Sequence, residues 1–533
     1  MPSISPSRLK NPERPLPLWL LFPPIFAFVY LTHITLLRLP YFWDEAGYYI
    51  PAAYDFFRTG TLVPQSTLTT GHPPLPSILL AGWWHLSGFV PSGTRTAVCI
   101  VSAFALLAVY RIARPICGQL GAAVVMLLTA LYPIWFAQST LAHADIFAAA
   151  FTLWGISLYL DGVDAPRVST AKLLAMAALF GLSVLAKETA LIAPLLLALV
   201  EFTRLVRSQW QRLGTFAALL SPLVPLSLWY AYHRHVTGFI FGNPGFLRYN
   251  ATANFGAERI ALALFHRAIH LTAHMNLFVP VLCALACFFL PLLPERKPVP
   301  RNILITAWAL LFSYWIAFSV LGGALLNRYL LTAYPLVILL CVAMWQRRVR
   351  NWWPLAALSA AAFISGIFIN PPYHFAPEDN LAYRDMIVLQ QDATSFILQR
   401  WPQATVLTAF PMADELRKPE LGYVHTPMKV VQIDNFSLPQ MQLAAGEEND
   451  VDTALLFSTK YDPPSLRRRN VTMDTQYFDF HRDLSPGPAA AILHGNIVWQ
   501  EHRNGLWAAV VRLDKGSLAA LHEVPIAPTI INR

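Results

Sequence analysis

Long apolar runs alternate with short polar segments through the first 370 residues. A helix needs about 20 apolar residues to cross the hydrocarbon core of a bilayer. Nine runs suit such a helix and lie near 16–38, 95–113, 118–137, 143–160, 215–232, 275–293, 303–322, 329–346 and 352–369. The stretch 171–203 is too long for one helix and contains Lys187 and Glu188, so we expect two spans that meet at a polar turn. The pattern predicts about eleven membrane-spanning helices.

The last 163 residues carry a different pattern. Short apolar segments between turn-forming residues predict strands at 404–410, 428–433, 453–459, 495–502 and 506–513. Residues 395–401 favour a helix, 466–470 a basic loop and 371–380 a linker that leaves the membrane. We therefore expect a polytopic membrane domain over 1–370, followed by a soluble α/β domain over 371–533.

Composition supports this division. Of the 533 residues, 56% are apolar and 13% are charged, whereas soluble domains average about 25% charged residues. The first 370 residues hold 36 of the 69 charged residues, and the last 163 hold the other 33. All five cysteines lie in the apolar part without the spacing of a zinc site, so we expect buried thiols. These features exclude one large soluble protein and give no indication of nucleic-acid binding.

The basic residues predict the topology. Lys and Arg accumulate in the short cytoplasmic loops of membrane proteins. With the amino terminus in the cytoplasm, 16 of the 25 basic residues before position 371 fall in every second loop. An odd number of spans then places the carboxy-terminal domain outside, which is the periplasm if the cell is a Gram-negative bacterium. Two long loops, 39–94 and 233–274, lie on the same outer side, and residues 76–90 suit a helix along the membrane surface.

The densest chemical signal follows the first span. The segment Tyr41–Tyr49 reads YFWDEAGYY, with Asp44 and Glu45 set between aromatic residues. Adjacent carboxylates in such surroundings are partly desolvated, which suits one of them to general-base catalysis on a hydroxyl or an amine. The alternative is a solvated helix start whose acids lie near the positive end of the helix dipole.

Three more polar positions on the outer side are candidates for binding. His72 precedes two prolines, which define its backbone rigidly, although a plain loop histidine is the alternative. Lys187 interrupts a long apolar stretch and suits a lipid phosphate, with a snorkelling lysine paired to Glu188 as the alternative. Arg328 begins a span and offers paired donors to a phosphate, with an interfacial anchor as the alternative.

These motifs resemble a known family. WDE at 43–45, HPPL at 72–75, HAD at 143–145, AKE at 186–188 and NRYLLTAYP at 327–335 resemble bacterial protein O-mannosyltransferase-like enzymes. Those enzymes are GT-C glycosyltransferases and include the lipid A aminoarabinose transferases. The resemblance covers roughly residues 16–346, with the first outer loop as its most specific part. It implies a GT-C helical bundle that carries a carboxy-terminal α/β domain outside the membrane.

The resemblance also implies an activity. Such enzymes move a sugar from a polyprenyl-phosphate carrier to an acceptor on the outer side and invert the anomeric centre. Asp44 would then be the general base, and Glu45 would orient the acceptor or partner Asp44. The residues expected to bind substrate are Tyr48, His72, Asp145, Lys187, Arg328 and Tyr329. His72 stands where the aminoarabinose transferases usually have lysine, and Gly71 where they have glutamate, which argues against identity with that subgroup.

Other readings remain open from sequence alone. A transporter or flippase of a lipid-linked sugar is one, although transporters carry midplane charges and internal repeats that are not evident here. A non-catalytic sensor and a ligase with an oligosaccharide donor are others. The lipid phosphate is already a leaving group, so no nucleotide site is needed, and a divalent cation near Asp44, His72 and Asp145 is left open. The expected partners are the donor lipid, a glycan, lipid or protein acceptor, and the bilayer.

Overall fold

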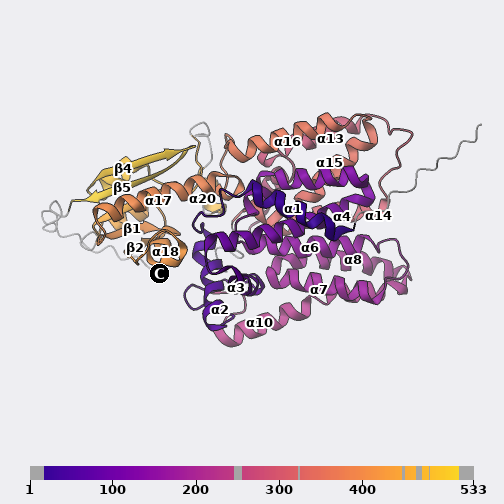
Figure 1. The fold of residues 1–533 in the computed structure, drawn as a ribbon, viewed down its shortest axis with the longest axis horizontal. Coiled ribbons are helices and arrows are strands. Elements are labelled where there is room, and N and C mark those ends of the chain that lie inside the picture. The colour runs from indigo at the N-terminus through magenta and orange to yellow at the C-terminus, as the bar shows by residue number, and fades with distance from the viewer. Residues whose placement is uncertain are drawn as a thin grey trace, which may run out of the picture.

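The computed structural model shows a long helical body with a smaller α/β unit at one end (Figure 1). The described residues are 17–244, 255–321, 324–446, 451–463, 471–478 and 481–514. The amino-terminal basic residues and the predicted basic loop at 466–470 lie outside these ranges. Throughout the helical body, buried apolar side chains form one continuous core.

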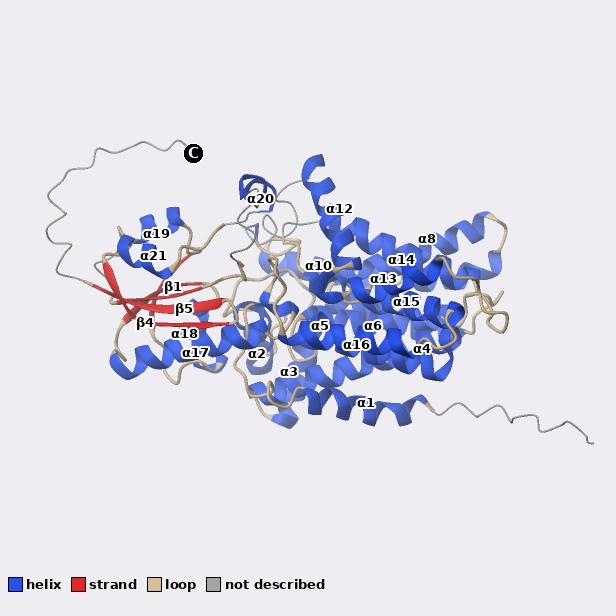
Figure 2. Cartoon of the chain, turned by 90° about the horizontal axis from the view of Figure 1, so that it is seen from above, coloured by secondary structure: helices blue, strands red, loops and turns tan. Residues whose placement is uncertain are grey.

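Apolar helices lie side by side in the body, as both views show (Figures 1 and 2). They are α1 Leu18–Thr32, α4 Pro91–Leu131, α6 Ala144–Leu160, α7 Thr170–Ala186, α8 Ile192–Val206, α9 Leu213–Leu220, α10 Leu223–Thr237, α13 Phe278–Phe288, α14 Arg301–Val320, α15 Tyr334–Arg348 and α16 Trp353–Phe368. Helix α4 has 41 residues and is broken at Gly118, whose φ of 70° is left-handed. At about 1.5 Å per residue α4 is twice as long as one crossing requires, so the break divides it into the two runs that the sequence predicts.

Among the described residues, four helices are long and apolar enough to cross a membrane, or five if one bent pair is a single span. Four shorter apolar helices accompany them: α1, α6, α7 and α16. The predicted number of about eleven spans therefore stays a prediction.

Part of the long outer segment predicted over 233–274 is helical. Helix α12, Ala257–Thr272, occupies much of its second half. The helical segment Ala257–Asn276 is bent by 101° against Phe278–Phe288. Met275 and Asn276 have left-handed φ values of 48° and 65° at the bend, which ends the helical path.

The first outer loop is largely helical. A π-helix, η1 Glu45–Tyr49, leads directly into α2 Ile50–Thr59. Helix α3, Leu75–Ser87, forms where the sequence predicts a surface helix, and Pro76 in its first turn suits a helix start. Short helices also join the spans on this side: α5 Pro133–Gln138, η2 Glu188–Leu191, η6 Asn327–Leu330 and η7 Pro377–Asp379.

The carboxy-terminal unit contains all five predicted strands. They are β1 Thr405–Ala409, β2 Lys429–Ile433, β3 Thr453–Phe457, β4 Gly495–Arg503 and β5 Leu506–Leu513. The sheet order is β2-β1-β3-β5-β4, with β1 parallel to β2 and β3, and β5 antiparallel to β3 and β4. Helices α17 Ala382–Arg400 and α18 Met412–Arg417 lie on one face of the sheet (Figure 2). Helices α19 Leu438–Ala444 and α21 Pro486–Ile492 cover the other face, and α20 spans Val471–Phe478.

Hydrogen bonds fasten this unit to the first outer loop. The Tyr41 amide donates to the Leu421 carbonyl (3.3 Å), and the Tyr423 hydroxyl donates to the Tyr41 carbonyl (3.1 Å). Lys418 Nζ donates to the Ser66 carbonyl at 3.1 Å. The α/β unit therefore lies against the loop that carries Asp44.

Candidate active site

Arg328 is the centre of a charged cluster built from four segments. Its guanidinium donates hydrogen bonds to Asp44 of the first outer loop and to Glu378 of η7. Its Nε lies 3.3 Å from Asp145 Oδ2, in the first turn of α6. The Arg328 side chain is only 3% exposed. A buried guanidinium that faces three carboxylates is strongly held, because its planar fork can donate in several directions.

Lys187 supplies the second cation of the cluster. Helix α7 ends at Ala186, and the extended backbone at Lys187 separates it from η2, in agreement with the predicted polar turn. Lys187 Nζ lies 2.7 Å from Asp145 Oδ1 and 4.1 Å from the centre of the Tyr329 ring. Its side chain is 5% exposed and points into the protein, unlike a lysine that snorkels to water.

Asp44 is the carboxylate of this cluster with the greatest exposure. Its side chain is 20% exposed, compared with 4% for both Asp145 and Glu378. The preceding residue, Trp43, has a left-handed φ of 48°, an unusual conformation for a bulky residue. Such strained backbone is common at functional sites, where the surrounding structure holds it.

Glu45 occupies a different environment from its neighbour Asp44. Its Oε2 accepts from the Phe42 amide (2.9 Å) and from Arg95 (3.3 Å), and its Oε1 accepts from the Ala142 amide (2.6 Å). The side chains of Glu45 and Arg95 are both fully buried. Arg95 also donates to the Leu39, Pro40 and Thr140 carbonyls. The pair thus ties the first outer loop to α4 and to the segment before α6.

His72 pairs with Glu188 instead of joining the Arg328 cluster. Its Nδ1 lies 2.8 Å from Glu188 Oε2, and its ring lies 6.3 Å from Tyr49 in a nearly parallel orientation. A cleft of about 40 Å³ is lined by these rings, by Tyr48 and by Ala144 and Trp229. That volume holds about one water molecule, so a sugar would require the cleft to widen.

Glu378 is a site residue that the sequence reading missed, because it lies in the segment expected to be a linker. Burial raises the pKa of Glu378 to about 8, and the nearby Asp44 carboxylate adds to the shift while Arg328 opposes it. Glu378 is therefore mostly protonated at neutral pH. Its Oε1 has no hydrogen-bond partner among the described residues.

His143 is a second residue that lines this cluster. Its Nδ1 lies 2.9 Å from Gln138 Oε1 and 4.0 Å from Glu378 Oε2, and its ring is fully buried. The Nε2 of His143 has no hydrogen-bond partner among the described residues.

The described part of the chain contains no group of three or more His, Cys, Asp or Glu side chains that could hold a metal ion. Asp44 and Asp145 face Arg328, whereas His72 is bonded to Glu188. The three residues considered for a divalent cation are thus engaged with different partners.

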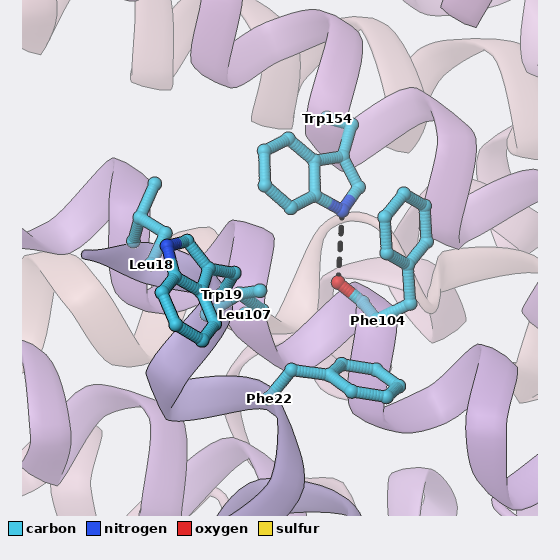
Figure 3. Close-up of a pocket in the computed structure, with 6 residues that line it drawn as sticks. All are labelled: Leu18, Trp19, Phe22, Phe104, Leu107 and Trp154. Carbon is cyan, nitrogen blue, oxygen red and sulfur yellow. Dashed lines mark hydrogen bonds between the residues drawn. The ribbon is translucent and has the colours of Figure 1, made fainter.

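A larger hollow of about 600 Å³ lies elsewhere, between α1, α4 and α6 (Figure 3). Its lining consists of Leu18, Trp19, Phe22, Phe104, Leu107 and Trp154. Trp154 Nε1 donates to the Phe104 carbonyl at 2.9 Å. None of the six lining residues is ionisable. The Arg328 cluster, and not this hollow, carries the groups needed for chemistry.

The fold of the whole chain matches that of known glycosyltransferases. ArnT from Cupriavidus metallidurans in the apo state aligns with a TM-score of 0.57 and 15% identity, over 92% of this chain and 97% of that chain. The same protein bound to undecaprenyl phosphate gives a TM-score of 0.55 and 16% identity, with the same coverage. The chain therefore has the GT-C glycosyltransferase fold, with a small carboxy-terminal sheet, and the predicted fold class is confirmed.

Comparison of the sequence with protein-family models gives a match over part of the chain. The family described as dolichyl-phosphate-mannose-protein mannosyltransferase matches residues 71–229, which include His72, Asp145 and Lys187. No curated protein sequence matches the chain. Among solved structures, the oligosaccharyltransferase from Archaeoglobus fulgidus, solved with Zn and sulfate, also aligns, at 11% identity over 81% of this chain and 68% of that chain, with a TM-score of 0.45.

Proposed function

We propose that this chain is a membrane glycosyltransferase that takes a sugar from a polyprenyl-phosphate donor and transfers it to an acceptor on the outer side. The observation that carries the proposal is the Arg328 cluster, in which a partly exposed carboxylate, Asp44, lies beside buried cations. A base and a cationic site for a leaving phosphate are the two groups that such a transfer needs. ArnT shares this fold and binds undecaprenyl phosphate, which supports a carrier of this class.

In the proposed reaction Asp44 accepts the proton of an acceptor hydroxyl. The acceptor oxygen then attacks the anomeric carbon from the face opposite the phosphate. The bond between that carbon and the phosphate oxygen breaks, and polyprenyl phosphate leaves with the electron pair. Attack from the opposite face inverts the anomeric centre. Arg328 holds the carboxylate of Asp44 in place, which reduces the loss of orientational freedom on the way to the transition state.

Lys187 and Arg328 hold the carrier phosphate in this proposal. In the structure both cations are bonded to carboxylates, and Asp145 contacts the two of them. An entering phosphate oxygen therefore replaces a carboxylate contact. Glu378, which is largely protonated at neutral pH, can give up its contact with Arg328 without leaving a buried negative charge.

The other predicted site residues have supporting roles in the proposal. Tyr48 and His72 line the cleft that widens to admit the donor sugar. Tyr329 contacts Lys187 through its ring face and keeps the ammonium group near the cluster. Glu45 positions the loop through Arg95 instead of touching the acceptor.

The chain lies in the bacterial inner membrane in this proposal, with a cytoplasmic amino terminus and a periplasmic α/β unit. Arg328 contacts Glu378 in η7, which lies directly before α17 of the α/β unit, so the Arg328 cluster lies next to that unit. Arg111 and Asp161 form an ion pair at the opposite end of α6 from Asp145. That placement agrees with a site on the outer side and with the distribution of basic loops.

Native mass spectrometry of the detergent-purified protein with its bound lipids tests the proposal. Asp44→Asn is expected to accumulate a polyprenyl-phosphate sugar, whereas the wild type carries the bare polyprenyl phosphate. Asp161→Asn is the matched control, because Asp161 accepts from Arg111 as Asp44 accepts from Arg328, and it should behave like the wild type. If neither protein binds such a lipid, even after undecaprenyl phosphate is added, the proposed function is wrong. Unchanged transfer by Asp44→Asn would remove Asp44 as the base and leave the glycosyltransferase proposal standing with another base.

A further inference from the structure

Three aromatic side chains form a cluster beside Asp44. Trp43 and Tyr48 belong to the first outer loop, and Phe410 follows β1 in the carboxy-terminal unit. The Phe410 ring centre lies 5.8 Å from that of Trp43, edge to face, and 5.5 Å from that of Tyr48. All three residues are half-buried. Because Trp43 directly precedes Asp44, this aromatic cluster borders the proposed base.

The position of Phe410 is fixed by close packing. A Cβ atom at Gly47 would lie 2.2 Å from Phe410 Cε2, so only glycine allows this ring to approach the backbone of η1. The hydrogen bonds from Tyr41 to Leu421 and from Lys418 to Ser66 hold the two parts of the chain together on either side of this contact. The aromatic cluster is therefore preformed in the folded protein, although its members come from distant parts of the sequence.

The aromatic cluster also adjoins the cleft of His72. Tyr48 lines that cleft and contacts Phe410, so one residue belongs to both groups. The cleft includes Pro76 and Ser77 of α3 and Trp229 of α10, which lead toward the membrane-spanning helices. Phe410 belongs to the α/β unit outside the membrane. In the proposed reaction a donor lipid approaches through the cleft of His72. An acceptor from the aqueous side meets the aromatic cluster.

We infer that Trp43, Tyr48 and Phe410 bind a sugar ring of the acceptor, which makes the acceptor a glycan. This inference rests on the proposed function, because Asp44 must be the base for the cluster to border the reacting hydroxyl. The face of an aromatic ring is electron-rich and attracts polarised C–H bonds. A pyranose presents a face of C–H bonds to such rings and hydroxyl groups to a carboxylate. A peptide serine or threonine satisfies the carboxylate but offers no pyranose C–H face to the aromatic cluster.

Saturation-transfer NMR on the full-length, detergent-solubilised protein tests the inference without requiring transfer. The probes are the methyl pyranosides of glucose, mannose and galactose, together with a serine-containing tripeptide. At least one glycoside is expected to receive saturation on the C–H protons of one ring face. Phe410→Leu should reduce that signal about fivefold or more, whereas Phe410→Tyr keeps an aromatic ring and should retain it.

The matched control is Phe396→Leu. Phe396 is also half-buried in the carboxy-terminal unit and has two aromatic neighbours, Trp401 at 6.0 Å and Trp499 at 6.2 Å, but it is remote from Asp44. Its replacement should leave the glycoside signal unchanged. Trp43→Asn is a second test, and it leaves Phe410 unchanged. Asparagine tolerates the left-handed φ of 48° at this position. That variant should also lose the signal.

Equal glycoside signals in the wild type, Phe410→Leu and Trp43→Asn would overturn the inference. Stronger saturation of the tripeptide than of every glycoside would also overturn it and favour a protein acceptor. Asp44→Asn should bind the glycosides like the wild type, since it keeps the three rings. The lipid mass spectra test the proposed function separately, so a failed glycoside experiment overturns this inference without overturning the proposed function.

Discussion

Arg328 donates a hydrogen bond to Glu378, although the two residues are 50 positions apart in the chain. The residues beside them are paired as well, because Asn327 Nδ2 donates to Asp379 Oδ2 at 2.7 Å. His274 Nε2, at the bend between α12 and α13, lies 2.8 Å from the same oxygen. The segment that leads to the α/β unit therefore fixes the arginine that contacts Asp44, so the carboxy-terminal half contributes directly to the site.

Replacement of Arg328 by lysine should reduce sugar transfer about 100-fold, as measured by turnover of a polyprenyl-phosphate sugar. A lysine carries the charge but has no planar fork, so it cannot hold Asp44 and Glu378 at the same time. Arg111→Lys is the control, because Arg111 pairs with Asp161 at the other end of α6 and should keep its rate. Full turnover in Arg328→Lys would show that charge alone suffices at this position.

The raised pKa of Glu378 predicts a pH dependence for carrier binding. As the pH rises through about 8, Glu378 loses its proton and adds a negative charge beside Asp44 and Asp145, which weakens binding of a phosphate. Glu378→Gln imitates the protonated form and should bind undecaprenyl phosphate like the wild type at pH 6.5. At pH 9 the variant should bind more tightly than the wild type.

The control for this comparison is Glu295→Gln, since Glu295 is half-exposed and forms an ion pair with Arg350 far from the cluster. Titration of the lipid phosphate itself affects all three proteins in the same way. If the wild type and Glu378→Gln lose affinity equally between pH 6.5 and 9, Glu378 is not the titrating group.

Much of the fold could be predicted because burial leaves a periodic signal. The five strands were predicted within two residues at either end, since apolar segments are bounded there by turn-forming residues. Helix α12 was missed because its arginines suggest an exposed loop. In the structure Arg259 and Arg267 are buried, and they donate to the Ser319, Val320, Phe318 and Leu326 carbonyls at and after the end of α14. A charged side chain that caps another helix cannot be recognised from its own segment.

The candidate site was predicted in part, because isolated charges are conspicuous in an apolar sequence. Asp44, Asp145, Lys187 and Arg328 stand out as rare charges at the ends of apolar runs, and the structure brings them together. Glu378 lies among prolines in a polar segment, where a solvated acid is the ordinary expectation. Glu378 is distinguished only by its pairing with Arg328 in the folded chain. No local sequence pattern indicates that these two residues meet.

The structure separates Asp44 from Glu45 and predicts different effects for their replacement. Glu45→Gln leaves the buried Arg95 without its carboxylate, which costs about 3–5 kcal/mol and should lower the thermal unfolding midpoint by several degrees. Asp44→Asn changes a partly exposed group and should abolish transfer with little change in that midpoint. Scanning calorimetry and turnover on both variants decide the assignment. A stable but inactive Glu45→Gln would instead place Glu45 in the chemistry.

Glu415, in α18, should be replaceable with a gain in stability. Its side chain is fully buried, and neither carboxyl oxygen has a hydrogen-bond partner among the described residues. Burial raises the pKa of Glu415 well above its ordinary value of 4.5, so folding is disfavoured increasingly as the pH rises above that value, where the unfolded chain ionises freely.

Glu415→Met fills a similar volume without an unsatisfied polar group and should raise the free energy of unfolding by about 1–3 kcal/mol. The gain should be larger at pH 8 than at pH 5, because only the wild type retains the proton on folding. Glu420→Met, at a partly exposed position of the same region, should change the unfolding midpoint little. A loss of stability in Glu415→Met at both pH values would mean that the carboxyl is needed where α18 packs beside η1, next to the loop that carries Asp44.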